Sequence, residues 1–407
     1  MRASLPQAKA LRGATTASRG ADVVRGHARA GARARLAHWT YWPRLGPRRR
    51  DTLRVGVWPN HVTGSENPYQ TIVYAGAPVQ VVPFWHLCDA LRLHRLGQID
   101  LLHIHFDEGY AYQATPDTDA EAAQAHIAML RAFRARGGRY VWTLHNTNPA
   151  VYAERPGFAL MRRHMAETSD LIVVHTPAAA AYLRAGFAVD PARIVLIEHP
   201  SFLGWIGALP AATPPPARRR FLQFGDIKAY KGVNRALAGF AELSCPERAE
   251  YIIAGKPDAG VTLDLARFPD DGVLRTSLER VPEADVPGLF AGADFTLLAY
   301  DRLLTSGVAL MSVSYGVPVI APAFGEMAGS LPTELGPLLY DPDAPDGLRR
   351  ALEYACTMPA DAHLALQHAC RAFAERIAPE VQARKLMAAL GTAGLLPGDP
   401  MIAGGAP

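Results

Sequence analysis

Three lysines stand out in a chain that otherwise uses arginine for its basic side chains. Only five of the 42 basic residues are lysine. Lys228 and Lys231 lie in the run FGDIKAYKG and Lys256 lies in IIAGKP, each directly after an apolar stretch that predicts a buried strand. A compact ammonium group binds phosphate oxygens as a point charge. The pattern indicates an anion site, although chance retention on a solvated loop remains the alternative, above all for Lys256.

Two turns into predicted helices would supply backbone donors to the same anion. Gly225 ends one apolar run, and a helix predicted to begin near Gly232 would direct its positive end at the loop. Further along, the polar turn Thr305-Ser306-Gly307 precedes an apolar helix. Ser306 is a suitable N-cap, which would leave the amides from Gly307 onward free to donate. Either turn alone could serve only to cap a helix, but two on adjacent strands favour a diphosphate site.

Acids and histidines follow two apolar runs in the first half of the chain. The run HIHFDEGY places Asp107 and Glu108 just past a predicted strand, and WTLH ends at His145. A carboxylate in this position could act as the general base for an acceptor hydroxyl. His103 and His105 share one face of the strand. No third ligand follows at metal-binding spacing, so these two histidines are interpreted as core or cleft-lining residues and no metal site is predicted.

Two parallel sheets are needed to bring these side chains together. Five apolar runs occupy residues 53–59, 100–106, 139–145, 170–176 and 193–199, and five more occupy 220–225, 250–255, 293–300, 316–322 and 336–340. Buried strands that alternate with helix-length segments predict an α/β protein with two doubly wound, Rossmann-like domains facing a cleft. Ligands of such folds bind at the carboxyl ends of the strands.

Length and composition agree with two domains. The chain has 407 residues, of which 49% are hydrophobic and 20% charged, and a single core seldom grows to that length. We expect an extension at 1–50, a first Rossmann-like domain at 51–206, a proline-rich linker at 207–220, a second Rossmann-like domain at 221–375, and a helix with a flexible tail at 376–407. Four scattered cysteines predict neither a disulfide framework nor a zinc site.

The first 50 residues differ from the rest in charge. They carry a net charge of +11, which leaves −7 on the remainder. The segment RLAHWTYWPRLGPRRR interleaves aromatic rings with arginines and could rest on an anionic membrane surface. A disordered extension, a start codon assigned too early and a transit peptide are the alternatives. No secretory signal is apparent and the total charge is near balance, so we expect a cytoplasmic protein that does not bind nucleic acid, with peripheral attachment to the inner face of the membrane as an alternative.

Residues 220–345 resemble the donor-binding domain of a GT-B glycosyltransferase related to family four. The matching segments, in the order and spacing of the family, are FGDIKAYKGV, IIAGKP, VPEADVPGLFAGADFTLLAY, TSGVALMSVSYGVPVIAP and GPLLYDPDAPDGLRRALE. The first half is similar more loosely to the acceptor domain, through NPYQ (67–70), DLLHIHF and WTLHN. The resemblance does not include the first 50 residues.

The resemblance implies sugar transfer from a UDP- or GDP-linked donor to a saccharide or lipid-linked saccharide, with no metal and no cofactor besides the co-substrate. Lys228 and Lys231 would hold the diphosphate, with Gly225 allowing close backbone approach. Ser306 and Gly307 would add donors that stabilise the charge growing in the transition state.

The remaining site residues are assigned less directly. His145 matches a family histidine near the transferred sugar, and Asp107 is the candidate base. Retaining members carry two glutamates at the positions of Leu303 and Met311, so the stereochemical outcome is not implied. Glu326 could replace the lost ribose contact or be a solvated loop acid. A nucleotide-sugar epimerase and a non-catalytic nucleotide-sugar binding protein remain alternative functions.

Overall fold

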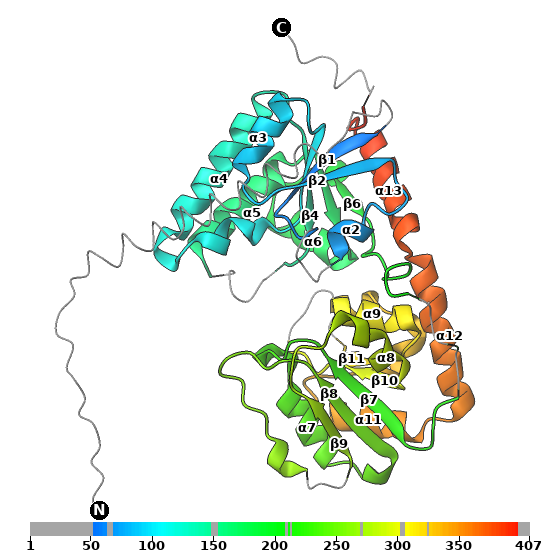
Figure 1. Ribbon diagram of the computed structural model, residues 1–407. Coiled ribbons are helices and arrows are strands. Elements are labelled where there is room, and N and C mark those ends of the chain that lie inside the picture. The colour runs from blue at the N-terminus through cyan, green and yellow to red at the C-terminus, as the bar shows by residue number, and fades with distance from the viewer. Residues whose placement is uncertain are drawn as a thin grey trace, which may run out of the picture. The chain divides into compact units, whose positions relative to one another are not determined.

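The computed structural model contains two parallel six-stranded sheets, each flanked by helices (Figure 1). The structure describes residues 52–62, 68–147, 154–207, 211, 214–268, 272–301, 306–323 and 325–397. The extension predicted at 1–50 therefore lies outside the described residues. No helix in the described ranges has the length and apolarity needed to cross a membrane.

The first sheet has the spatial order β2-β1-β3-β4-β5-β6, and every neighbouring pair is parallel. Its strands are β1 (Leu53–Trp58), β2 (Val79–Pro83), β3 (Leu101–Ile104), β4 (Tyr140–Leu144), β5 (Leu171–Val174) and β6 (Ile194–Leu196). Its helices are α2 (Tyr69–Ile72), α3 (Cys88–Arg95), α4 (Asp119–Arg134), α5 (Pro156–Thr168) and α6 (Pro177–Gly186). Every residue of β1, β3, β4 and β5 is buried, as expected for parallel strands covered on both faces.

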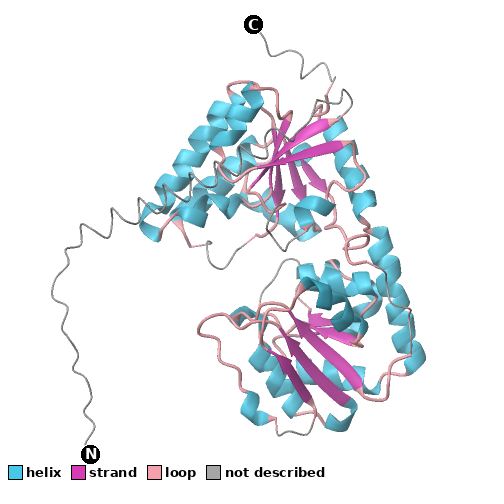
Figure 2. Cartoon of the chain, viewed as in Figure 1, coloured by secondary structure: helices cyan, strands magenta, loops and turns pink. Residues whose placement is uncertain are grey.

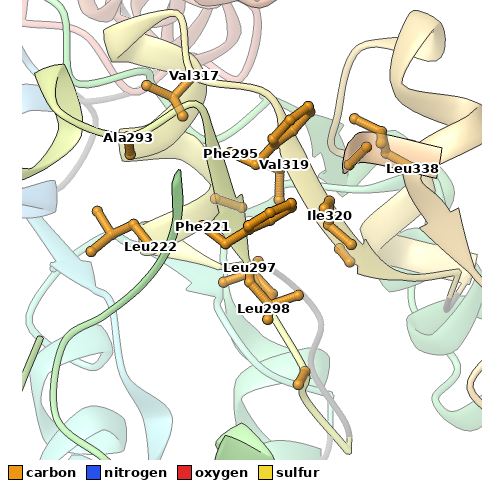
Figure 3. Packing of buried hydrophobic residues seen from close by; sticks show 14 of the residues in the cluster. Phe221, Leu222, Ala293, Phe295, Leu297, Leu298, Val317, Val319, Ile320 and Leu338 are labelled. Carbon is orange, nitrogen blue, oxygen red and sulfur yellow. The ribbon is translucent and has the colours of Figure 1, made fainter. Parts of the chain in front are cut away.

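The second sheet has the order β12-β11-β10-β7-β8-β9 and is also parallel throughout (Figure 2). Its strands are β7 (Arg219–Phe224), β8 (Ala249–Ala254), β9 (Leu274–Ser277), β10 (Phe295–Leu297), β11 (Val319–Pro322) and β12 (Leu339–Tyr340). Its helices are α7 (Val233–Ala241), α8 (Val286–Ala291), α9 (Gly307–Tyr315), α10 (Gly325–Gly329) and α11 (Gly347–Thr357). Phe221 and Phe295 stack in its core with ring centroids 5.4 Å apart (Figure 3).

The last two helices, α12 (Ala360–Arg376) and α13 (Pro379–Thr392), have different partners. Helix α12 packs against α9 of the second domain. In α13, Leu386 and Leu390 belong to the same buried cluster as Leu53 and Val55 of β1. The chain therefore returns after the second domain and completes the core of the first.

The predicted α/β class with two Rossmann-like sheets is confirmed. Each of the ten predicted strand runs contains a strand, but β2 and β9 were not predicted. Both are edge strands, and three residues of β9 are exposed. An edge strand covered on fewer sides does not need a continuous apolar run, which is the signal the prediction used.

Candidate active site

The loop from β7 to α7 turns at Gly225, whose φ of +88° lies in the left-handed region that favours glycine. Its amide donates to the carbonyl of Ala254, 2.9 Å away. A Cβ built on Gly225 would lie 3.2 Å from Nζ of Lys231 and 3.9 Å from Cγ2 of Val308. The lysine ammonium and the first turn of α9 therefore meet at the bare backbone of this turn, as an anion cradle requires.

Lys231 is a buried lysine with only 9% of its surface exposed. Burial lowers the pKa of its ammonium to about 8, Asp226 opposes that shift, and the positive charge of Lys228 adds to it. None of the ion pairs found among the described residues involves Lys231. A desolvated cation beside a second cation is stabilised when an anion arrives, so the electrostatics favour a negatively charged ligand at this position.

Two further glycines hold neighbouring loops together. Gly232 has a φ of +62°, and a Cβ there would lie 1.8 Å from the carbonyl oxygen of Ala299. A Cβ on Gly255 would lie 2.2 Å from the carbonyl oxygen of Gly225. The missing side chain of Gly232 therefore makes room for the segment that follows β10.

Helix α9 begins as predicted, with Ser306 as its N-cap. The Ser306 hydroxyl oxygen accepts a hydrogen bond from the amide of Ala309 at 3.1 Å. The amides of Gly307 and Val308 have no acceptor within the helix. A Cβ on Gly307 would meet no atom within 4 Å, so this end of the helix is open to approach. Thr305 lies outside the described residues, and the ligand-binding role of the turn remains a prediction.

A cavity of about 580 Å³ opens at this edge of the second sheet. Gly225, the exposed Lys256 and Met311 are among the residues that line it. Lys228 is half-buried in the same loop as Lys231. Glu326 belongs to α10, but its side chain lies outside the described part of the structure.

Arg280 and Glu283 also line this cavity, and sequence reasoning missed both. They lie in the segment LERVPEADV after β9, at the outer edge of the sheet. A pair of opposite charges in a loop after a strand is the sequence feature that could have identified them. Because β9 lacks a continuous apolar run, the sequence does not mark this loop as a strand end.

Asp107 forms a buried ion pair with Arg162. The guanidinium donates from Nε and Nη2 to the two carboxylate oxygens at 2.8 and 3.1 Å, and both side chains are 1% exposed. Arg162 also donates to the carbonyl of Thr147 at 2.8 Å. With both oxygens occupied and buried, Asp107 is poorly placed to accept a substrate proton. The ion pair ties the end of β3 to α5, which favours a structural role for Asp107, and its assignment as general base remains a prediction.

The neighbouring Glu108 fits the role of base better. It is buried in the 3₁₀ helix η2 (Asp107–Gln113), and burial together with the charge of Asp107 raises the pKa of its carboxyl to about 7. A hydrogen bond with the side chain of Asn146, the residue after His145, partly opposes this shift. A carboxylate with a pKa near neutrality is suited to accept a proton at physiological pH.

His145 stacks on Phe106 with ring centroids 4.3 Å apart and meets the edge of Tyr69 at 4.6 Å. Burial and neighbouring histidines hold its pKa well below the usual value, so the ring is neutral at pH 7. Its buried Nε2 has no hydrogen-bond partner among the described residues. It therefore offers an unused polar atom at the strand edge, consistent with a ligand contact that remains a prediction.

A row of histidines at the strand ends was only partly recognised from the sequence. His105, His145, His175 and His199 follow β3, β4, β5 and β6 respectively, and all four rings contact Tyr69. The missed signal was a histidine closing four successive apolar runs. Within the described ranges, no group of three or more potential ligand side chains could hold a metal ion. His103 pairs with Tyr74 and Thr143.

Replacing Asp107 by asparagine is expected to destabilise the protein by about 3–5 kcal/mol, because it leaves the Arg162 guanidinium buried without its counter-charge. Urea unfolding measures this loss. The double variant Asp107→Asn, Arg162→Met should lose less than the sum of the two single variants. An Asp107→Asn protein as stable as wild type but inactive would support Asp107 as the base.

No protein-family model matches the chain. The chain is 28% identical over 275 residues to the GDP-mannose:glycolipid 4-beta-D-mannosyltransferase of Xanthomonas campestris pv. campestris, covering 67% of this chain and 74% of that protein. Sucrose-phosphate synthase of Thermosynechococcus elongatus matches with a TM-score of 0.61 and 16% identity, over 84% of this chain and 98% of that one. Anabaena HepE, solved with UDP and glucose, matches with a TM-score of 0.58 and 12% identity, over 84% and 100%.

These similarities confirm the predicted class. The chain has the GT-B fold, and the predicted enzyme type, a glycosyltransferase, is confirmed. The Xanthomonas relative, which is 28% identical, is named as a mannosyltransferase that uses GDP-mannose and a glycolipid.

Proposed function

We propose that this protein transfers a mannosyl group from GDP-mannose to a hydroxyl of a lipid-linked saccharide and releases GDP. The observation that carries the proposal is the junction of Gly225, the buried Lys231 ammonium and the open first turn of α9, where Gly225 also lines the 580 Å³ cavity. Small-molecule sites commonly have this size. The sequence relative named for GDP-mannose and a glycolipid supports the choice of substrates.

The departing diphosphate would be stabilised by the chain itself and without a metal. Lys231 and Lys228 supply positive charge, and the amides of Gly307 and Val308 point their dipoles at the same place. Such fixed groups neutralise the charge that grows on the phosphate oxygen as the bond from C1 breaks. Turnover that is unchanged by EDTA would support this part of the proposal, and loss of turnover would contradict it.

The reaction would proceed with inversion. GDP-mannose is an α-glycosyl phosphate, and the relative is named for a β-mannoside product. Inversion in one displacement requires a base for the acceptor hydroxyl, and Glu108 has the fitting pKa of about 7. The acceptor oxygen bonds to C1, Glu108 takes its proton, and the electron pair of the breaking bond leaves with GDP. Met311 in place of a carboxylate agrees with a departure from the retaining members.

Glu283 supports guanine as the base of the donor. A carboxylate accepts two hydrogen bonds from the N1–H and N2–H edge of guanine, whereas uracil presents a single N–H. We expect nucleotide release from GDP-mannose in preference to UDP-glucose. Glu283→Gln should weaken GDP binding about 10-fold, as expected for the loss of one charged hydrogen-bond partner, and leave UDP binding unchanged.

Calorimetry with GDP and UDP measures this preference. Glu279→Gln is the matched control, because Glu279 is an exposed acid close by in the same segment and does not line the cavity. Equal losses of GDP and UDP affinity in Glu283→Gln would contradict the guanine assignment.

The positive charge of the first 50 residues supports a lipid-linked acceptor and a location at the membrane surface. The net charge of +11 on residues 1–50 would hold the enzyme at an anionic membrane surface on the cytoplasmic side, where a lipid-linked saccharide is accessible. An assay of several nucleotide sugars, each with and without acceptor, could give two other outcomes that would redirect the proposal. A changed sugar with donor alone would indicate an epimerase, and nucleotide binding with no turnover on any acceptor would indicate a non-catalytic binding protein.

A further inference from the structure

A second cavity, of about 290 Å³, opens at the carboxyl edge of the first sheet and is called here the aromatic cavity. Its walls come from the segments that follow β1 and β2, from η2 and from α4. The residues that matter for its chemistry are Trp58, Trp85, Gly109, Tyr112 and His126. It shares no lining residue with the 580 Å³ cavity of the second domain.

We propose that the aromatic cavity binds an uncharged sugar ring of the acceptor saccharide. This inference rests on the proposed transferase function and adds to it the place and the chemical class of the acceptor contact.

The lining of the cavity excludes a charged ligand. None of the residues found to line it is Asp, Glu, Lys or Arg. A phosphate or carboxylate bound here would lose its hydration without gaining a counter-charge, which is strongly unfavourable. The ligand that fits is neutral, and a volume of about 290 Å³ suits a small group such as one sugar ring rather than a lipid chain long enough to cross half a bilayer.

Two large aromatic rings with exposed surface, those of Trp85 and Tyr112, line the cavity. The side chains of Trp85 and Tyr112 are 46% and 44% exposed, among the most exposed large apolar side chains described. Trp58 is buried beneath them, and its indole Nε1 donates to the backbone carbonyl of Trp85 at 3.0 Å. This bond fixes the Trp85 backbone. The C–H face of a pyranose packs on such rings while its hydroxyl groups stay hydrated or hydrogen-bonded.

His126 supplies a polar atom for the sugar hydroxyls. Its Nδ1 lies 2.8 Å from the carbonyl oxygen of Ala122. A carbonyl can only accept, so Nδ1 carries the hydrogen and Nε2 of the neutral ring is an acceptor. Burial lowers the pKa of the ring and keeps it neutral. The ring lies 5.5 Å from Trp58, centroid to centroid, within the aromatic wall.

The segment that carries the proposed base also contributes to the cavity wall. Gly109, which lines the cavity, directly follows Glu108 in η2. A Cβ on Gly109 would lie 3.0 Å from Cη2 of Trp58 and 3.2 Å from Cγ of Pro59, so a side chain there would press on the aromatic wall.

The test uses the full-length protein and intrinsic tryptophan fluorescence without any donor. The probes are methyl β-D-glucopyranoside, cellobiose and mannobiose at up to 50 mM, with sodium glucuronate as the charged control and decanol as the apolar control. The variants are Trp85→Ala and Gly109→Ala. Tyr354→Ala, which removes an equally exposed aromatic ring from α11, is the matched control.

At least one neutral saccharide should change the fluorescence saturably, and Trp85→Ala should weaken its affinity about 10-fold while Tyr354→Ala leaves it unchanged. Gly109→Ala, which keeps both exposed rings, should also weaken it. The same two variants should raise the KM for acceptor and leave GDP affinity unchanged. A fluorescence change with glucuronate or decanol but not with the neutral sugars would overturn the proposal. The absence of a fluorescence change with every probe would overturn it as well. Saccharide binding without any nucleotide release would leave the cavity assignment intact and refute the transferase function.

Discussion

Lys231→Ala is expected to lower turnover about 10²–10³-fold, the loss typical of removing one group that stabilises transition-state charge. The Lys231 ammonium lies against Gly225 in a buried position, so water does not replace it well. Nucleotide release from GDP-mannose in the presence of acceptor measures the effect. Lys385→Ala is the matched control, because Lys385 makes only an exposed ion pair with Glu198, and its activity should stay within about 2-fold.

The fold should survive this substitution. The pKa of Lys231 falls from 10.5 in the unfolded chain to about 8 in the folded protein. The folded state therefore binds fewer protons between these values, and this group makes stability rise with pH through that window. At pH 7 the buried charge costs stability, so Lys231→Ala should melt at the same temperature or higher. A large drop in Tm would show that lost activity reflects unfolding.

The pH dependence of GDP binding provides an independent check on the same lysine. Bound diphosphate requires the protonated ammonium, so affinity should fall as the pH rises above about 8, approaching about 10-fold per pH unit. Calorimetry between pH 7 and 9.5 measures this slope. Lys231→Ala should bind weakly and without this slope. A wild-type affinity that is flat across this range would place the lysine away from the phosphates.

Glu108→Gln is expected to lower turnover about 10²–10⁴-fold, as loss of a general base does. Gln keeps the size of the side chain and its hydrogen bond with Asn146 but cannot take a proton. GDP affinity should be unchanged, because this residue belongs to the first domain. Wild-type turnover should rise with pH through about 7, where Glu108 ionises. This rise in turnover should be absent from the pH profile of the variant.

The stability of Glu108→Gln distinguishes a catalytic role from a structural one. The pKa of Glu108 rises from 4.5 in the unfolded chain to about 7 in the folded protein. The folded state binds more protons in that window, so this group makes stability fall as pH rises from 4.5 to 7. At pH 8 the variant should therefore be at least as stable as wild type, measured by thermal unfolding. Normal turnover in a stable Glu108→Gln protein would exclude Glu108 as the base.

Local sequence features predicted the elements of the second domain well. The run ending at Gly225 and the N-cap at Ser306 both appear where expected, because a positive φ and a helix cap are satisfied by residues a few positions apart. The same reasoning placed His145 at a strand end. The choice between Asp107 and Glu108 as the base could not be made from local sequence, since it depends on Arg162, which lies 55 residues further along.

The sequence by itself determined ten of the twelve strands, the ammonium-bearing loops and the helix cap, because each is encoded within a few neighbouring residues. The tertiary structure decided the rest. It paired Asp107 with Arg162, left Glu108 with the raised pKa, and set Gly232 against the carbonyl of Ala299. These outcomes depend on burial and on contacts between distant segments, since desolvation and charge pairing depend on neighbours in space rather than on neighbours in sequence.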